Sequence, residues 1–491
     1  MKNRCRLAGS TESRNERIER ALRSGGRVHL IGVAGAGMNA LAALLLARGC
    51  ALSGSDQQTS AQVERLIDGG MIFFQGHGST QINGAELVII SAAIREHNPE
   101  LAAARAARIP VVKRAEALGM LLRDRRVIAV AGTHGKTTTS AMLAVILTRA
   151  GARPTFVVGG EVLDLGASAA ADVGEWAVVE ADEYDRSFLQ LKPETVLITN
   201  VEPDHLEYYG TLEAMHEAFR QFIALIRPGG ALVRNVADPF LHALTGDPER
   251  EMVDCLGEGV ESSASWRASD IVEDAHGSRF TLHHPGGGQC PVILPLSGLH
   301  NIGNAVQAIA AAARAGVSPK TAAEALRSFR GAGRRFQAVG EAGGVLVIDD
   351  YAHHPTEVRA TLAAARARYP RRRLIAVFQP HTYSRTARLF DQFVGAFDAA
   401  DELVVTAIYA ARETDTLGMD ARRLVEAIAA RTGAPPTTYV PDLTAIPAAL
   451  APCLHSGDLV LTLGAGSITE IGPRLLAELG GRGRPPAAAG W

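Results

Sequence analysis

Short apolar runs alternate with longer, helix-compatible stretches over most of the chain. Residues 28–33 have the pattern of a buried strand, and residues 38–48, rich in Ala and Leu, have the composition of a helix. This alternation continues to about residue 122 and is typical of a parallel sheet with crossover helices. A second unit begins with the strand at Val127, and a third begins near Gly331. The pattern therefore predicts an α/β fold with three units.

The second and third units contain further predicted strands, at residues 176–179, 195–199, 345–348, 374–378, 402–406 and 459–463. Residues 249–295 differ from the rest, because they are polar and Gly-rich and contain only short β-like runs such as residues 279–284. We expect an antiparallel excursion there, followed by a helix over residues 298–313.

Composition and charge narrow the class of protein. The 491 residues are 47% hydrophobic and 21% charged, which is ordinary for globular domains, and the length suggests about three of them. The formal net charge of −2 offers no strong field for nucleic acid. The five cysteines are scattered without a CxxC pair, which fits a reducing compartment. Because no apolar run reaches about 18 residues and no apolar leader is present, we expect a cytoplasmic protein without a membrane span.

The most informative chemistry lies at residues 127–139, where a strand-like run leads into a small-residue turn and a helix-compatible segment. The turn and the residues after it are Gly132, Thr133, His134, Gly135, Lys136, Thr137 and Thr138. Glycines let the backbone wrap a phosphate, and a helix start offers free N–H donors. Lys136 would reach the β- and γ-phosphates, and Thr137 would hold Mg²⁺. Val130 stands where the general P-loop pattern has a glycine, so a generic strand–turn–helix junction is the alternative.

Two acidic segments follow predicted strands. Four carboxylates lie within residues 180–185, and residues 199–205 place two acids beside His205. Carboxylates this close repel one another unless a cation or donors lie nearby, and sites in α/β folds gather at the carboxyl ends of strands. We favour Mg²⁺ binding by Glu180 over the alternative of a solvated acidic loop. His205 is a further candidate ligand, although a lone histidine is more often structural.

A glycine cluster follows the first strand of the chain. Gly32, Gly35 and Gly37 are spaced GxxGxG, unlike the GxGxxG of dinucleotide-binding folds. The cluster indicates a close approach of the backbone to a ligand, such as a diphosphate at a helix start. Asp56 ends the next strand region, where it could meet a sugar hydroxyl or only cap the following helix.

Three polar segments in the later part of the chain are further candidates. Asn301 and Asn304 lie three residues apart on one helix face, where they could contact an adenine edge or only cap the helix. Residues 349–357 open a helix after a strand with two acids and two histidines. His381 and Arg385 follow another strand and suit an anionic substrate, and an ordinary surface loop is the alternative.

Taken together, these motifs resemble the Mur ligases of peptidoglycan synthesis over about residues 27–475. The segments that carry the resemblance are residues 132–139, 180–183, 199–205, 300–304, 334–336, 349–355 and 379–386. They occur in the family's order, which chance does not readily produce. The resemblance implies a Rossmann-like N-terminal domain, a central P-loop ATPase-type domain and a Rossmann-like C-terminal domain.

The resemblance also implies domain limits and an activity. The expected parts are an N-terminal arm (1–26), a UDP-sugar-binding domain (27–122), an ATP-binding ligase domain (123–331), an amino-acid-binding domain (332–480) and a flexible tail (481–491). The implied reaction joins L-alanine to the lactyl carboxylate of UDP-N-acetylmuramate. ATP would convert that carboxylate into an acyl phosphate, and the alanine amine would displace the phosphate. ATP and Mg²⁺ are the implied cofactors, and the chain would act as a monomer or homodimer without nucleic acid.

The resemblance assigns roles to individual residues. Lys136, Glu180, His205 and Arg335 would be catalytic, and Thr137, Glu180 and His205 would hold Mg²⁺. ATP would contact residues 132–138 together with Asn301, Asn304, Arg335 and Asp350. The UDP sugar would contact Gly32, Gly35, Gly37, Asp56, His77 and Ser91. Tyr351, His353, His381 and Arg385 would contact the amino acid or the sugar acid.

The nearest alternative within the family is the murein-peptide recycling ligase, which attaches a peptide to the same sugar acid. Residues 199–209 look more like the alanine-adding branch. Residues 209–226 contain no lysine, whereas several sister ligases use a carbamylated lysine there, and this also favours that branch. Thr382 departs from the arginine that many members carry, which leaves the substrate-carboxylate contacts open. A non-catalytic nucleotide-binding scaffold is a more distant alternative, which the retained catalytic residues argue against.

Overall fold

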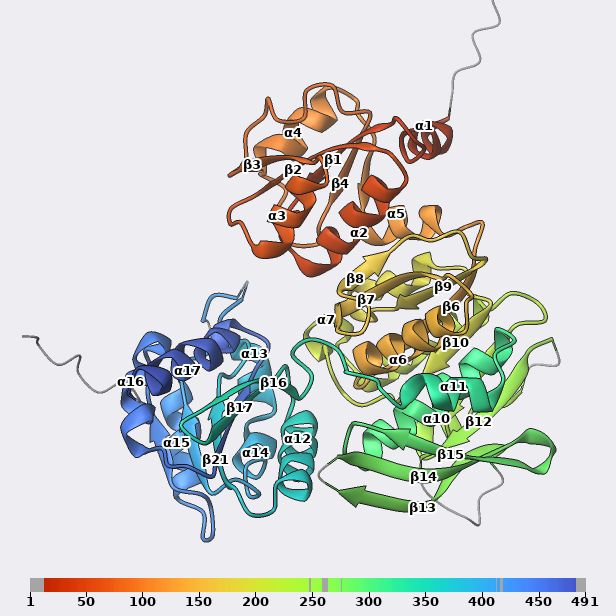
Figure 1. The fold of residues 1–491 in the computed structure, drawn as a ribbon. Helices are drawn as coiled ribbons and strands as arrows, with labels where there is room; N and C mark the ends of the chain where they lie inside the picture. Colours follow the sequence, from red (N-terminus) through yellow and green to blue (C-terminus); the bar gives the residue numbers. More distant parts are fainter. Residues whose placement is uncertain are drawn as a thin grey trace, which may run out of the picture.

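The structure, a computed structural model, describes residues 13–482 apart from residues 247–248, 258–263, 275, 412 and 416–417. Three sheets of five, ten and six strands follow one another along the chain, each covered by helices (Figure 1). The predicted α/β class is therefore confirmed. Among the described residues, none of the helices is long and apolar enough to cross a membrane.

The first sheet is fully parallel, with strand order β3-β2-β1-β4-β5. Its elements are α1 (Arg14–Ala21), β1 (Arg27–Ile31), α2 (Ala36–Ala47), β2 (Ala51–Asp56), α3 (Ala61–Asp68), β3 (Ile72–Gln75), β4 (Leu87–Ile90), α4 (Pro99–Ala106), β5 (Val111–Lys113) and α5 (Arg114–Leu121). The strand order reverses at β1, which opens a crevice at its carboxyl end. The predicted arm contains α1, whose Ile18 and Ala21 are buried, and its residues 1–12 lie outside the described chain.

The second sheet has ten strands in the order β15-β14-β13-β12-β11-β10-β6-β9-β7-β8. Its strands and main helices are β6 (Arg126–Ala131), α6 (Lys136–Arg149), β7 (Thr155–Val162), β8 (Ala167–Ala170), β9 (Trp176–Glu180), η1 (Tyr184–Gln190), β10 (Thr195–Ile198), α7 (Leu206–Tyr209), α8 (Leu212–Ala224), β11 (Ala231–Asn235), α9 (Pro239–His242), β12 (Glu251–Leu256), β13 (Trp266–Asp274), β14 (Gly277–His284), β15 (Gly288–Leu294), α10 (Leu299–Arg314) and α11 (Pro319–Leu326). Strands β13, β14 and β15 pair antiparallel, which confirms the predicted excursion, although β12 pairs parallel with β11.

The third sheet has the order β16-β17-β21-β18-β19-β20, and all its pairs are parallel except β16 with β17. Its elements are β16 (Gln337–Ala342), β17 (Val345–Asp350), α12 (Pro355–Arg368), β18 (Arg373–Phe378), α13 (Tyr383–Arg388), α14 (Phe390–Val394), β19 (Glu402–Val405), α15 (Ala421–Ala429), β20 (Thr437–Tyr439), α16 (Ile446–Leu450), β21 (Asp458–Leu463) and α17 (Ile471–Arg482). Of the predicted tail, residues 481 and 482 close α17, and residues 483–491 lie outside the described chain.

The apolar cores divide unevenly among the three sheets. One cluster runs from the first sheet to one face of the second, so that Leu41 and Leu118 share it with Phe188 and Phe219. The opposite face of the second sheet packs under α6, α10 and α11, and the third sheet has a separate cluster on each face. At Gly119, an added Cβ would lie 2.2 Å from the carbonyl oxygen of residue 190, so α5 and η1 are in direct backbone contact. The first two sheets therefore share one hydrophobic interior, and the third does not.

Candidate active site at the carboxyl ends of the strands

The loop between β6 and α6 is built by two glycines with positive φ. Gly132 has φ 128°, and an added Cβ would lie 2.2 Å from Oγ1 of Thr199. Gly135 has φ 80°, and an added Cβ would lie 2.7 Å from Oδ1 of Asn304. Side chains are excluded at both positions, which leaves the start of α6 open to a phosphate.

Lys136 lies inside this loop and is held by a buried acid. Its Nζ donates to Oε1 of Glu183 at 3.0 Å and to the carbonyl oxygen of Thr133 at 3.1 Å. Burial acts to lower the pKa of Lys136, but the attraction of Glu183 and its acidic neighbours is stronger, and the pKa is raised. The amine is therefore an ammonium beside the loop of residues 132–135, which we call the phosphate loop.

Thr137 and Glu180 lie side by side next to Lys136. The Thr137 hydroxyl donates to Oε1 of Glu180 at 3.0 Å, and the backbone N–H of Gly159 donates to Oε2 of the same carboxylate. A Cβ on Gly159 would approach that carboxylate to 2.6 Å, so a larger residue there would displace the Glu180 side chain from its present position. A hydroxyl and a carboxylate in contact offer the oxygen ligands that Mg²⁺ prefers, so these two residues fit the predicted ion.

Beyond β10, Asp204 and His205 meet residues of the third sheet. Nη2 of Arg385 lies 3.2 Å from Oδ1 of Asp204, with a tenth of each side chain exposed. Arg385 also contacts Nδ1 of His381 at 3.1 Å. Burial raises the pKa of Asp204, yet Arg385 and the nearby histidines outweigh it, and the pKa is lowered. His205 itself has φ 52°, a conformation that is costly for a residue with a side chain and is concentrated at functional sites.

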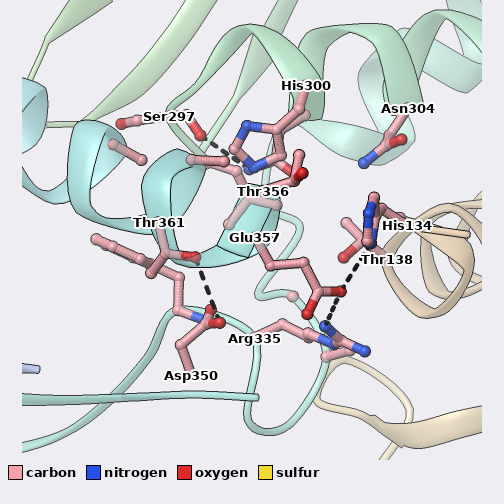
Figure 2. Close-up of a pocket in the computed structure, with 18 of the residues that line it drawn as sticks. His134, Thr138, Ser297, His300, Asn304, Arg335, Asp350, Thr356, Glu357 and Thr361 are labelled. Atoms are coloured by element: carbon pink, nitrogen blue, oxygen red, sulfur yellow. Dashed lines mark hydrogen bonds and ion pairs between the residues drawn. The ribbon is translucent and has the colours of Figure 1, made fainter. Parts of the chain in front are cut away.

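A pocket of about 1050 Å³ lies next to the phosphate loop, between the second and third sheets. Figure 2 shows residues from both sides of this boundary turned toward the same space. The predicted ATP residues that line it are His134, Gly135, Thr138, Asn301, Asn304, Arg335 and Asp350. The structure thus brings seven residues spread over more than 200 positions of sequence to one cavity.

His134 crosses the boundary between the two sheets. Its Nδ1 lies 3.2 Å from Oε1 of Glu357 on α12 (Figure 2). Its Nε2 lies 3.5 Å from Oε2 of Glu202. Burial acts against the charged ring, but the two carboxylates prevail and raise the pKa of His134 to about 9. Ligand atoms of His134, Glu202 and His354 lie within 4.8 Å of one another, as a metal site would need. Nδ1 of His354 accepts the N–H of Thr356, which leaves its proton on Nε2, so the cluster suits a proton better than a metal ion.

Two further members of the pocket organise the start of the third sheet. The Arg335 guanidinium lies 5.0 Å from the ring of Tyr351 and 3.9 Å from Oε1 of Glu357. Asp350 accepts the N–H groups of Phe336 and Ala352 at 2.7 and 2.8 Å, and its burial raises its pKa to about 6. Asp350 therefore ties the residue after Arg335 to the segment that follows β17.

The two asparagines of α10 have different surroundings. Nδ2 of Asn301 donates to the carbonyl oxygen of Ser297 at 2.8 Å, but α10 begins after Gly298 without a side-chain cap, so Asn301 does not cap the helix. Asn304 is buried and sits against Gly135 of the phosphate loop. Both asparagines line the pocket.

The glycine cluster of the first sheet lies at a second pocket. An added Cβ at Gly32 would lie 3.2 Å from Cβ of Ser91, and Gly35, Gly37 and Ser91 line the pocket together with Glu180. Oδ2 of Asp56 accepts the N–H of Ala34 at 2.9 Å, so Asp56 holds the glycine loop. The cap of α3 is Ser60, which removes the helix-cap alternative for Asp56.

Comparison with known proteins identifies the family. Three family models match: the Mur ligase family catalytic domain at residues 27–126, the Mur ligase middle domain at 130–312 and the Mur ligase glutamate ligase domain at 334–466. A UDP-N-acetylmuramate–L-alanine ligase of Thermobifida fusca is 44% identical over 463 residues, which are 93% of this chain and 97% of that protein. The chain belongs to the Mur ligase family.

Solved structures of Mur ligases have the same architecture. A UDP-N-acetylmuramate–alanine ligase from Thermotoga maritima matches with a TM-score of 0.79 and 27% identity, covering 92% of this chain and 98% of that one. A murein peptide ligase from Psychrobacter arcticus matches with a TM-score of 0.71 and 28% identity, covering 92% and 98%. The predicted resemblance is confirmed. Of these two structures, the alanine ligase has the higher TM-score.

The sequence did not reveal several residues at the cleft of this Mur ligase. Lys113 and Arg114, at the end of β5, line the pocket of the glycine cluster and bring two cations to it. The basic pair directly after the apolar residues 109–112 was the available signal. Glu202 and Glu357 carry the contacts of His134; both lie in segments that the sequence marks as candidates, but their pairing with His134 depends on how the second and third sheets dock.

Proposed function

We propose that this Mur ligase joins L-alanine to the lactyl carboxylate of UDP-N-acetylmuramate at the expense of ATP, through an acyl phosphate. The observation that carries the proposal is that two loops at the same edge of the second sheet bear an ammonium, at Lys136, and a contact with an Arg–His pair of the third sheet, at Asp204. The first feature suits a nucleoside triphosphate, and the second suits a carboxylate. We further propose that the enzyme works in the cytoplasm as a monomer or homodimer.

The phosphoryl-transfer part of the reaction belongs to the β6–α6 region. Lys136 supplies positive charge beside the phosphate loop, where it stabilises the transferred phosphoryl group. Thr137 and Glu180 would hold Mg²⁺, with His205 as a further ligand; the bound ion would neutralise charge on the phosphate oxygens. A free carboxylate is a poor electrophile, and its phosphorylation supplies the leaving group that the alanine amine displaces.

The carboxylate-binding part belongs to α13 and the loop before it. Arg385 exchanges its contact with Asp204 for a substrate carboxylate, because both groups compete for the same guanidinium. Burial first, and then the Arg385 charge, lower the pKa of His381 to about 4, so its ring is neutral near pH 7. With Nδ1 facing Arg385, Nε2–H remains to donate to the substrate. His353 lies 5.7 Å from the His381 ring and 5.3 Å from that of Tyr351, which completes the wall of this region.

The sugar nucleotide belongs at the pocket of the first sheet. The backbone of Gly35 and Gly37 at the start of α2 suits a diphosphate, and Lys113 and Arg114 add positive charge to the same pocket. Glu180 lines this pocket as well as standing beside Thr137, so the sugar acid is brought to the phosphoryl-transfer region.

The function is tested by phosphate release from ATP with UDP-N-acetylmuramate and Mg²⁺ present. We expect release that depends on free L-alanine and an amide product. Release that requires a tripeptide and ignores L-alanine would identify a recycling ligase instead. Absence of release with either amine would reject the ligase assignment.

Replacing Lys136 tests the phosphate loop directly. We expect Lys136→Ala to lower kcat by a factor on the order of 10³, because a charge that stabilises the transferred group is lost. Lys320→Ala on α11 is the matched control, since Lys320 is exposed and distant from the cleft. Thermal unfolding of both variants checks that the fold is retained. Activity near that of the wild type in a folded Lys136→Ala protein would contradict the assignment.

A further inference from the structure

The first sheet contains a buried polar network that the proposed reaction does not use. Its centre is Glu100 at the start of α4, whose side chain has no exposed surface. Oε2 of Glu100 lies 2.7 Å from the Ser55 hydroxyl and 2.9 Å from Nδ1 of His77, and Oε1 lies 3.4 Å from Nε2 of the equally buried His29. Nδ1 of His29 in turn lies 2.8 Å from the Ser53 hydroxyl. A carboxylate buried to this degree is expensive unless donors surround it.

The hydrogen bonds at His77 follow from the charge of Glu100 and from the Ser55 hydroxyl, which donates to Glu100 and lies 3.1 Å from Nδ1 of His77. Burial acts to raise the pKa of Glu100, but its contacts with His29, Ser55 and His77 lower it, so the group is a carboxylate and can only accept. Nδ1 of His77 must then carry the hydrogen that Glu100 accepts. In the neutral ring the lone pair is consequently on Nε2.

The position of His77 leaves the lone pair on Nε2 accessible to a ligand. His77 follows β3 at the carboxyl edge of the sheet, and the preceding residue, Gly76, donates to the carbonyl oxygen of Asp56. Its side chain is 15% exposed, and no hydrogen bond of the described residues engages Nε2. Glu100 thus accepts a hydrogen bond from Nδ1 of His77. Nε2 is left for a ligand at the carboxyl edge of the sheet, where the nucleotide is expected.

We propose that Glu100 is a positioning residue that fixes His77 with Nε2 as a hydrogen-bond acceptor for a donor group of the uridine. This rests on the proposed binding of a UDP sugar to the first sheet. The shared chemistry is a donor on the nucleoside, which is either N3–H of the base or a ribose hydroxyl. His29 and Ser53 support Glu100 from the interior of the sheet. Two contacts of Nδ1, with Glu100 at 2.9 Å and with the Ser55 hydroxyl at 3.1 Å, hold the His77 ring in one orientation, whereas Oε1 of Glu100 and Nε2 of His29 lie at ion-pair distance without a hydrogen bond.

The protonation of His77 is measured first, on the unmodified protein. Side-chain ¹⁵N resonances distinguish a protonated ring nitrogen from a bare one. We expect Nδ1 of His77 to carry the hydrogen and Nε2 to be bare near pH 7.5. A hydrogen on Nε2, in either the other tautomer or the imidazolium, would overturn the proposal without any variant being made.

Binding of UDP by calorimetry tests the consequence. We expect Glu100→Gln to weaken UDP binding by about tenfold, because the amide can either accept from or donate to Nδ1 and so no longer selects one tautomer, while ATP affinity and kcat at saturating sugar nucleotide stay unchanged. Glu64→Gln on α3 is the matched control and should bind UDP normally, since Glu64 is exposed and its carboxylate accepts from the nearby Thr59 hydroxyl. An equal loss of UDP and ATP affinity in Glu100→Gln would indicate general damage and overturn the proposal.

A double variant separates positioning from structure. If Glu100 acts through His77, adding Glu100→Gln to His77→Ala causes no further loss of UDP affinity, and a further tenfold loss would overturn the proposal. CDP and 2′- and 3′-deoxy-UDP identify the donor, because His77→Ala abolishes the preference for UDP over the one analogue that lacks it. If every preference survives, Nε2 meets no donor and the proposal fails. Normal UDP binding without phosphate release would instead reject the ligase function alone.

Discussion

The second sheet contacts the first sheet mainly through apolar side chains and the third sheet through polar ones. Against the first sheet, α2 packs on β7 and β8 and α5 packs on η1, inside one continuous apolar cluster. Against the third sheet, the pairs are His134 with Glu357, Glu202 with Thr356 and Asp204 with Arg385. The apolar clusters of the third sheet contain only residues from 336 onward. Polar contacts exchange readily with ligands and water, whereas a shared core does not, so the third sheet is the part expected to move as substrates bind.

The largest expected effect comes from opening a cavity in the shared core. Phe188 is 1% exposed and stacks on Phe222 with ring centroids 4.5 Å apart. We expect Phe188→Ala to lower the free energy of unfolding by about 3–5 kcal/mol. Hydrogen exchange in mild urea should show lost protection in the strands of both the first and second sheets.

The matched variant lies in the separate core of the third sheet. Phe393 is fully buried there against Phe378, and Phe393→Ala should reduce protection only between residues 337 and 463. If Phe188→Ala leaves the first sheet fully protected, the two sheets do not share one cooperative core.

A second, smaller effect follows from the protonated ring at the polar boundary. The pKa of His134 is raised from 6.5 to about 9 by Glu202 and Glu357 against the cost of burial. A raised pKa contributes stability that is fully present below pH 6.5 and is lost as the pH rises through 9; its size is on the order of 3 kcal/mol at most. The free energy of unfolding of the third sheet, followed by urea titration between these pH values, should fall accordingly. His134→Asn should flatten that dependence, and an unchanged slope in this variant would place the titrating group elsewhere.

The smallest effect concerns a single hydrogen bond across the same boundary. The Thr356 hydroxyl donates to Oε2 of Glu202 at 3.0 Å. Thr356→Val should weaken docking of the third sheet by about 1 kcal/mol, which small-angle scattering would register as a larger radius of gyration without nucleotide. Thr437→Val is the control, because the Thr437 hydroxyl donates to the carbonyl oxygen of Pro435 within the third sheet.

Salt sharpens the same comparison. In about 1 M salt, where screening acts over about 3 Å, the wild type should expand in the same direction as Thr356→Val. A wild type whose dimensions ignore both salt and nucleotide would contradict a polar, mobile boundary.

Sequence periodicity located several of the strands and helices, and the glycine and lysine motif located the loop between β6 and α6, whereas strands such as β7 were not predicted individually. The run at residues 374–378 became β18 (Arg373–Phe378), and residues 298–313 became α10 (Leu299–Arg314), because buried strands and helices of an α/β fold carry their pattern locally. The two glycines of the loop were readable because a positive φ and a close neighbour both exclude side chains.

The rest of the site depends on how sheets dock, which no local pattern records. His134 and Glu357 are 223 positions apart, and their contact exists only because α12 meets the second sheet's loops. Glu100 reads locally as an ordinary acid in the first turn of a helix, although it is fully buried among two histidines. Its role follows from the strand order β3-β2-β1, which places residues 29, 55 and 77 side by side.

The direct backbone contact at Gly119 has a practical consequence for dissecting the molecule. A fragment that stops after the second sheet keeps that contact and both apolar clusters around it, and should be expressible as a stable piece. A fragment that stops after α5 would expose the apolar faces of α2 and α5 to solvent, and should aggregate. A truncation after the second sheet should therefore give a stable fragment, and a truncation after the first sheet should not.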